Sequence, residues 1–353
     1  MADRYWVGGT GTWDNTSTSV WSTSSGGGSG ASVPTSTDNV IFDQAGPYTV
    51  TTAVSERQCQ NITVSGANYT FRLAQNVRIF GDVTFHSTTL WETSTPGTKA
   101  NLIFGATSNF VSTVTTNGVT VGQVFFNHAQ VILGSDFVGS TLNTMNGGSS
   151  FDSAGYSFTC GNWTPSVNFN GIWNWRGSSI TVTGTSFICA NASFSWRATP
   201  QAFMNCTATT GASSAMTLGE SGSAIMEIPR INFIPNSANG FVNVSSNNLI
   251  YDFSCNRVGA KTIRFNQNTR LQSFNLRGSS GNVFTIQTGS SSQTSGTQRT
   301  LTKPGTWYVG ANSTNVSGNA NLTFTGGGNI DFLSFQDING SALSTGNFFS
   351  FMR

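Results

Sequence analysis

The sequence predicts an all-β fold and favours a β-solenoid over a β-sandwich, a jelly roll or a barrel. The 353 residues are rich in Thr, Val, Ile, Phe, Asn, Ser and Gly. The helix formers Lys and Glu occur only three and four times. Short alternating segments recur throughout, with Gly or Asn between them. Such strands are too short and too numerous for a sandwich, and the recurring Asn, Ser and Thr suit hydrogen-bonded ladders between stacked coils.

Three regions follow one another along the chain. Residues 1–38 are rich in Trp, Gly and Ser and are expected to form an N-terminal cap or docking segment. Residues 39–300 are expected to form a β-helical shaft, and residues 301–353 a C-terminal β module. At roughly 20 residues per coil, the shaft would hold about a dozen coils and be on the order of 60 Å long. Its clearest strand candidates are 40–42, 48–50, 61–64, 69–73, 77–80, 82–85, 124–126, 130–133, 157–160, 179–183, 262–265 and 283–286.

Composition places the chain among folded proteins. Aromatic residues make up 12% of it and charged residues only 8%, with a formal net charge of +2. Intrinsic disorder needs low hydrophobicity with high net charge, and this chain has neither. An overall charge of +2 also gives little general attraction to a polyanion, so nucleic acid is not an expected partner.

The five cysteines show no CxxC motif and no partner histidine at metal spacing. Neither a disulfide framework nor a zinc site is expected, and no cofactor is predicted. Three cysteines follow a phenylalanine by two residues, which on a strand places both side chains on one face. We therefore expect buried, reduced thiols packed beside phenylalanine in the pairs Phe158 and Cys160, Phe187 and Cys189, and Phe253 and Cys255.

The first residues carry charges at Asp3 and Arg4 and no apolar run, which is unlike a Sec signal peptide. No stretch approaches the roughly 18 apolar residues of a membrane-spanning helix. The expectation is a protein that folds in a cytoplasm, or leaves it without Sec, and does not insert into a membrane.

Two groups of residues are candidates for binding. The first is a cluster of tryptophans with neighbouring arginines, a combination that stacks on sugar rings or anchors protein interfaces, or else packs in the core of a wide coil. The second is a basic segment with almost no acidic residue near it in sequence, which suits an acidic patch of a neighbouring subunit or an anionic cell envelope, or else is a solvated face. The first group comprises Trp173, Trp175, Arg176, Trp196 and Arg197, and the second comprises Arg257, Lys261, Arg264, Arg270 and Arg277.

Candidate catalytic residues are few. Neither His86 nor His128 lies in a nucleophile motif, and no Gly-x-Ser-x-Gly elbow is present. Paired carboxylates would be needed to cleave glycans, and no Asp-Asp or Asp-x-Asp doublet occurs. Acids could still meet across coils, so a polysaccharide depolymerase stays open as an alternative. The expectation is a protein without enzymatic activity and without catalytic residues.

The N-terminal motifs resemble the β-strand repeat of autotransporter adhesins and similar segments in structural proteins of tailed phages. Part of the C-terminal region looks like the closing module of phage β-helical virion proteins. The N-terminal motifs are Tyr5-Trp-Val-Gly-Gly-Thr-Gly-Thr-Trp13, Val20-Trp-Ser22, Asp38-Asn-Val-Ile-Phe42 and Asn61-Ile-Thr-Val-Ser-Gly66, and the C-terminal ones include Gly305-Thr-Trp-Tyr-Val-Gly-Ala-Asn312.

This resemblance implies a right-handed parallel β-helix in an exposed adhesive or virion role. An autotransporter needs a Sec signal and a translocator barrel, which the chain lacks, so the phage interpretation is favoured over a bacterial surface adhesin. The expected function is a structural protein on the exterior of a tailed phage particle: a tail fibre or tailspike for host attachment, or a capsid decoration protein. The expected partners are further copies of the chain, with a homotrimer favoured by likeness to phage spikes, other virion proteins and host envelope glycan.

Overall fold

The computed structural model describes the backbone of residues 1–52, 55–144, 150–164, 172–174, 176 and 178–183, and beyond these the strands from β19 to β32. Side chains are described for residues 1–52, 55–105, 110–125, 127, 130–141, 150–161, 174, 176 and 178–183. All regular structure in these ranges is β-strand, which confirms the predicted all-β class. Within them, no helix has the length and apolar character that crossing a membrane would require.

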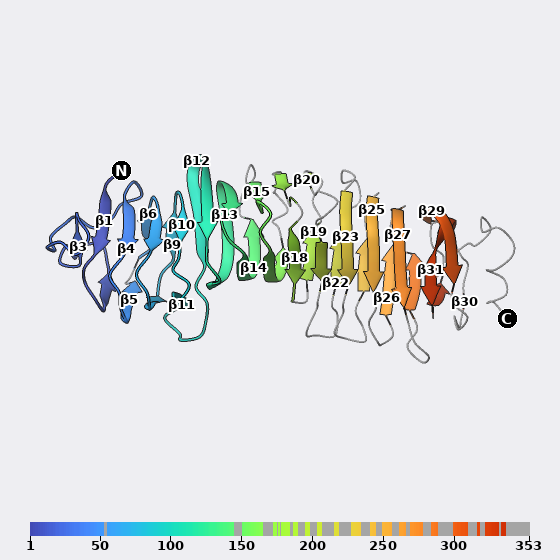
Figure 1. The fold of residues 1–353 in the computed structure, drawn as a ribbon, viewed down its shortest axis with the longest axis horizontal. Helices are drawn as coiled ribbons and strands as arrows, with labels where there is room; N and C mark the ends of the chain where they lie inside the picture. Colours follow the sequence, from blue (N-terminus) through green and yellow to red (C-terminus); the bar gives the residue numbers. More distant parts are fainter. Residues whose placement is uncertain are drawn as a thin grey trace. The chain divides into compact units, whose positions relative to one another are not determined.

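The chain divides into two compact units, Met1–Cys160 with Asn168–Asn174, and Gly161–Val167 with Trp175–Arg353. The strands of the first unit follow the chain from blue to green in Figure 1. They are β1 Asp3–Trp6, β2 Gly11–Trp13, β3 Trp21–Ser22, β4 Asn39–Phe42, β5 Tyr48–Thr52, β6 Arg57–Cys59, β7 Ile62–Val64, β8 Tyr69–Leu73, β9 Val77–Ile79, β10 Val83–Thr84, β11 Leu90–Thr93, β12 Leu102–Thr115, β13 Thr120–Leu133, β14 Phe137–Thr144, β15 Ser150–Asp152 and β17 Ile172–Asn174, while β16 Phe158–Thr164 crosses the boundary.

The strands of the first unit stack in three parallel ladders, and each ladder forms one of the three faces of the coil. The first ladder runs β1, β4, β7, β10, the end of β12, the end of β13, β15 and β17. The second runs β2, β5, β8 and β11, and the third runs β6, β9, β12, β13 and β14. Because each coil pairs with the next in parallel, this unit is a β-solenoid and neither a sandwich nor a jelly roll.

The coil length agrees with the predicted spacing. In the first ladder, Val40 pairs with Ile62 and Ile62 pairs with Val83, and both steps are close to the coil length expected from the sequence. The next step, from Val83 to Val114, is clearly longer, and the one after it, from Val114 to Leu133, returns to the expected length. The longer step contains an added turn between β11 and β12, which projects below β11 in Figure 1.

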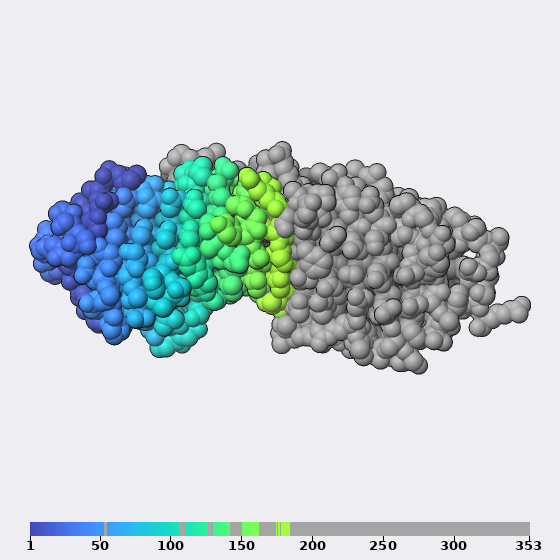
Figure 2. Space-filling view, viewed as in Figure 1, coloured from blue at the N-terminus to red at the C-terminus, as the bar shows by residue number. Residues whose placement is uncertain are grey.

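The N-terminal segment does more than cap the solenoid. β1 and β2 join the first and second ladders in parallel, so the first coil begins inside residues 1–38. β3 pairs antiparallel with β1, placing Trp21 opposite Trp6. The space-filling view shows successive coils as adjoining colour bands from blue to green (Figure 2).

Two strands are longer than the short strands expected from the sequence. β12 and β13 each span 14 residues, because each passes from one ladder to another without an intervening turn. The register between them shifts between Gly105 and Phe110, an irregularity of the β-bulge type that lets a strand bend.

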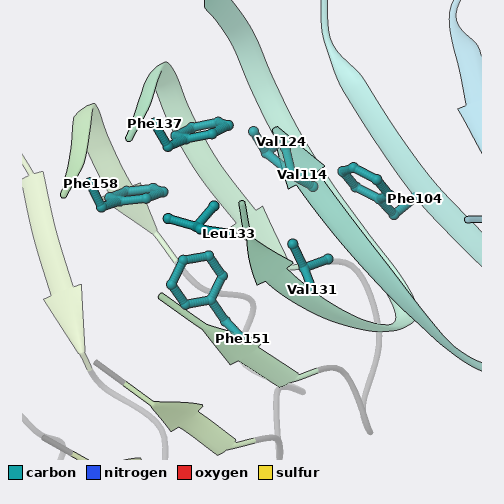
Figure 3. A pocket seen from close by; sticks show the side chains of 8 residues that line it. All are labelled: Phe104, Val114, Val124, Val131, Leu133, Phe137, Phe151 and Phe158. Carbon is teal, nitrogen blue, oxygen red and sulfur yellow. The ribbon is translucent and has the colours of Figure 1, made fainter. Parts of the chain in front are cut away.

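The core lies inside the coils and is formed by alternate residues of the strands. At the N-terminal end it is aromatic, with Phe42 at its centre. The ring of Phe42 lies 4.9 Å from that of Phe71 and 5.7 Å from that of Trp6, measured between centroids. Farther along the chain the core is aliphatic and phenylalanine-rich. Eight side chains, drawn in Figure 3, line a cavity of about 10 Å³ there. These are Phe104, Val114, Val124, Val131, Leu133, Phe137, Phe151 and Phe158.

A column of polar side chains joins successive coils outside the core. The Asn39 side-chain amide donates to Asp3 at 2.8 Å, and that of Asn61 donates to the Asn39 side-chain oxygen at 2.8 Å. The Asn61 oxygen in turn accepts the peptide N–H of Asp82 at 2.6 Å, and the Asp82 carboxylate accepts that of Thr113 at 2.7 Å. The expected hydrogen-bonded ladders between coils are thus confirmed in this unit.

The second unit has strands in two alternating ladders. One runs β18, β21, β23, β25 and β27, and the other runs β19, β22, β24, β26, β28 and β32, all parallel. The bounds are β18 Ser179–Val182, β19 Ser186–Cys189, β20 Ser195–Arg197, β21 Phe203–Cys206, β22 Ala215–Leu218, β23 Glu227–Phe233, β24 Phe241–Val244, β25 Leu249–Cys255, β26 Lys261–Phe265, β27 Thr269–Arg277, β28 Phe284–Thr288, β29 Arg299–Val309, β30 Val316–Ser317, β31 Leu322–Asp331 and β32 Leu333–Gln336.

Phe158 and Cys160 are both buried, each about 1% exposed, which confirms one of the three expected phenylalanine–cysteine pairs. The side chains of the pairs at 187 and 189 and at 253 and 255 lie outside the described residues. Neither Cys59 nor Cys160 is in a disulfide. Burial raises the pKa of the Cys59 thiol, so that little reactive thiolate forms.

Cys59 and Cys160 are therefore expected to stay unmodified when the native protein is treated with iodoacetamide. The same reagent should label both after unfolding in urea. Mass spectrometry of the digested protein gives the extent of modification at each cysteine. Rapid labelling of either thiol in the native state would contradict its place in the core.

Candidate functional site

A groove of about 360 Å³ lies at the N-terminal end of the solenoid, beside the start of the third ladder. The chain leaves the first coil after β2, forms β3, and returns to β4 through residues 33–36. The groove lies between this returning segment and β6. Its walls are formed by Trp13, Asn15, Val33, Pro34, Thr35, Ser36, Glu56, Arg57 and Gln58.

Arg57 occupies an inward position of β6 and is only 4% exposed. Its Nε donates to the Ser55 carbonyl at 2.9 Å and its Nη1 to the Asn15 side-chain oxygen at 2.8 Å. Its Nη2 donates to the Ser55 carbonyl at 2.8 Å and also to the Ser55 hydroxyl. Every hydrogen-bond acceptor of this guanidinium is therefore a neutral group.

Two carboxylates near Arg57 are engaged elsewhere. Glu56, also in the groove wall, accepts hydrogen bonds from Nε and Nη2 of Arg78 at 2.7 and 3.0 Å. Asp14 accepts the peptide N–H groups of Thr16 at 2.9 Å and Ser17 at 2.6 Å. These bonds lower the pKa of Asp14, the one from Ser17 most, so the carboxylate stays charged.

Asp38 fixes the segment that forms the outer wall of the groove. Its carboxylate accepts the Thr35 peptide N–H at 3.0 Å, the Thr35 hydroxyl at 2.8 Å and the Ala2 peptide N–H at 3.3 Å. Burial acts to raise the pKa of Asp38, but the Thr35 bonds, Arg4 and the Ala2 bond outweigh it, so the pKa is lowered. Ionised Asp38 therefore holds the first coil and the groove wall together.

The Asp38→Asn substitution is expected to lower the free energy of unfolding by about 1 to 3 kcal/mol, because an amide replaces a buried charged acceptor. A lowered folded-state pKa means that this stabilisation is present above the unfolded-state pKa and is lost as pH falls through the folded-state value. Melting temperatures measured from about pH 6 to pH 2 should therefore fall less for the variant than for the wild type. Parallel pH profiles would contradict the role assigned to Asp38.

The predicted tryptophan and arginine cluster is described only in part. Trp173 lies on β17, in register with Phe151 of β15, and its side chain is outside the described residues. Arg176 is exposed and has a positive φ of 27°. Trp196 and Arg197 lie on β20, with undescribed side chains, and Trp175 lies outside the described residues.

The predicted basic segment falls on two strands of the second unit that follow one another in sequence and belong to different ladders. Lys261 and Arg264 lie on β26, and Arg270 and Arg277 on β27. Arg277 is in register with Asp331 of β31, an acid that is remote from it in sequence. Arg257 and the side chains of the other four residues lie outside the described residues.

Sequence reasoning did not find the groove. One signal was available: Arg57 and Cys59 share a face of β6, and the cysteine is buried, so the arginine must point inward as well. An inward arginine is rarely left fully buried without a partner. The other wall residues come from separate segments that are distant from one another in sequence, and no spacing rule brings them together.

Among the described residues, no group of three or more His, Cys, Asp or Glu side chains is arranged to hold a metal ion. The chain matches no protein-family model, no curated protein and no solved structure.

Proposed function

We propose that the chain is a non-enzymatic structural protein on the exterior of a tailed phage particle, serving as a tail fibre or spike for host attachment or as a head decoration. The observation that carries this proposal is the use of polar side chains to join one coil to the next. The column from Asp3 through Asn39 and Asn61 to Asp82 runs along the first ladder, and Arg72 of β8 pairs with Glu92 of β11 across the second. Such cross-links suit a rigid shaft.

The carboxylates of the first unit support a structural role over a hydrolytic one. Three acids of this unit, Asp38, Asp82 and Glu92, have structural partners. Asp38 fixes the loop before β4, Asp82 accepts the Thr113 N–H, and Glu92 bonds to Arg72 and Lys99. Each carboxylate is held by donors from nearby segments of the same chain. A pair for glycoside hydrolysis instead needs two carboxyl groups that face one substrate and lie about 5 to 9.5 Å from each other.

Antibody labelling tests the proposal. Antibodies raised against the purified chain are expected to decorate intact particles of the phage that encodes it, seen by electron microscopy at the tail or the head. Particles that carry no label, and whose purified proteins lack the chain by mass spectrometry, would refute it. Release of reducing ends from host glycan by the purified protein would instead establish the depolymerase alternative.

The basic segment supplies a test of attachment and assembly within this proposal. Reversing Arg264, Arg270 and Arg277 to Glu is expected to leave the fold intact and to weaken either oligomer assembly or binding to host envelopes, and the wild-type interaction should weaken as salt rises. The matched Arg→Gln triple variant separates loss of charge from its reversal. Because Asp331 is the register partner of Arg277, Arg277→Glu alone should have the smallest effect on binding but the largest on stability.

Light scattering of the triple variants gives their assembly state, and sedimentation with host envelopes gives their binding. We expect the wild type to be an oligomer, with the trimer favoured. Wild-type-like assembly and envelope binding by the Glu variant would mean that the segment is only a solvated face.

A further inference from the structure

The guanidinium of Arg57 has no carboxylate within ion-pair distance among the described side chains. Burial lowers the pKa of Arg57, and the nearby charge of Asp14 only partly opposes this effect. Arginine stays protonated in proteins, so the group remains a buried cation served by neutral acceptors. Such a cation gains from an anionic partner, because an ion pair adds direct Coulombic attraction to the hydrogen bond.

The groove beside Arg57 has the size and the walls of a small-molecule site. Its volume of about 360 Å³ falls in the range of about 300 to 1,000 Å³ that is usual for such sites. The amide of Gln58 and the hydroxyl of Ser36 in the walls can bond to ligand hydroxyls. Asn15 and Thr35 keep only part of their bonding capacity, because Asn15 bonds to Ser55 and Arg57 and the Thr35 hydroxyl donates to Asp38. Val33 and Pro34 complete the wall with apolar surface.

We propose that this groove binds a sugar acid, with its carboxylate paired to Arg57 and its hydroxyls bonded to the amide and hydroxyl groups of the walls. The hydroxyl-binding groups of Gln58 and Ser36 beside the cation favour a sugar acid over an acidic peptide. Glu56 does not oppose the ligand, since its charge is neutralised by the two bonds from Arg78. The inference rests on the groove alone and holds whatever particle or surface carries the chain.

Isothermal titration of the purified full chain with glucuronate, glucose and a short Glu-containing peptide tests the proposal. Glucuronate is expected to bind in the millimolar range and glucose about tenfold more weakly, because glucose lacks the carboxylate that forms an ion pair with the guanidinium. Binding of glucuronate should weaken at high salt. Absence of glucuronate binding, equal binding of glucose, or binding of the peptide alone would overturn the proposal.

The Asn15→Asp variant distinguishes binding at Arg57 from binding elsewhere. The new carboxylate would stand where the Asn15 oxygen already accepts from Arg57 Nη1 at 2.8 Å, so the cation would be paired internally. We expect glucuronate affinity to fall by about tenfold or more, while the melting temperature stays equal or rises. Unchanged affinity in this folded variant would overturn the proposal.

A second variant probes the ligand hydroxyls without touching the buried cation. Gln58→Ala is expected to weaken glucuronate binding by about three- to tenfold, because Gln58 is exposed and lines the groove. Gln130→Ala is the matched control, since Gln130 is an exposed strand glutamine outside the groove, and it should bind as the wild type does. Equal affinities in the two variants would exclude this wall from the site.

Discussion

Replacing Phe42 with alanine is expected to lower the free energy of unfolding by about 3 to 5 kcal/mol, the usual cost of deleting a buried phenylalanine ring. The ring is fully buried and lies within 6.2 Å of five other aromatic rings, measured between centroids. Three of these rings are tryptophans of β1, β2 and β3, and the other two belong to β8, so Phe42 joins the first coil to the third.

Urea titration, followed by tryptophan fluorescence and by circular dichroism, measures this loss. Val111→Ala is the control, because Val111 is 57% exposed and its truncation should change stability by less than about 0.5 kcal/mol. A Phe42→Ala variant as stable as the control would mean that the aromatic cluster is not packed as described.

Glu92→Gln is expected to destabilise the protein by about 2 to 4 kcal/mol, because it removes the charge that two cations share. The Glu92 side chain is 7% exposed, and its carboxylate bonds to Arg72, to Lys99 Nζ at 3.0 Å and to the Gly97 peptide N–H at 3.1 Å. Since Arg72 and Lys99 are 25% and 31% exposed, water would partly compensate them, and the loss should be smaller than for a fully buried pair.

Glu56→Gln provides a matched comparison for this effect. Glu56 pairs with Arg78 across adjacent coils, but the two side chains are 32% and 26% exposed. An ion pair with this exposure contributes about 0 to 1 kcal/mol. In chemical denaturation, the Glu92→Gln variant should therefore have a clearly lower free energy of unfolding than the Glu56→Gln variant. Equal losses of stability in the two variants would show that burial of Glu92 does not strengthen its interactions.

Much of the first unit could be predicted from local patterns. Tyr69–Leu73 alternates apolar and polar residues and is a strand with the same bounds as predicted, because its alternation matches the two faces of the coil wall. Arg57–Cys59 was missed, since an inward arginine breaks the apolar alternation. The single long strand Thr120–Leu133 was expected as separate pieces, because alternation does not show whether a chain turns or bends between ladders.

The candidate site was less accessible to sequence reasoning than the fold. Periodicity identifies which face a residue occupies, but the groove depends on which turns meet, and that is decided by the path of residues 14–38 between the first two coils. Likewise, only the register between β27 and β31 shows that Asp331 is the strand partner of Arg277. Contacts between coils depend on the length of every intervening turn, which local patterns do not constrain.

The added turn between β11 and β12 is a position where the fold can accommodate an insertion. Residues 94–98 are exposed, and Gly97 has a positive φ of 83°, while the strands before and after the turn keep their ladder partners. Chain length can therefore change here without disturbing the ladders, provided that Gly97 and Lys99 keep their bonds to Glu92, since lengthening a surface loop adds little closure entropy. A foreign epitope inserted between Thr95 and Pro96 would be displayed on the outside of the coil, which makes this turn a natural position for sequence diversification and for antigen display.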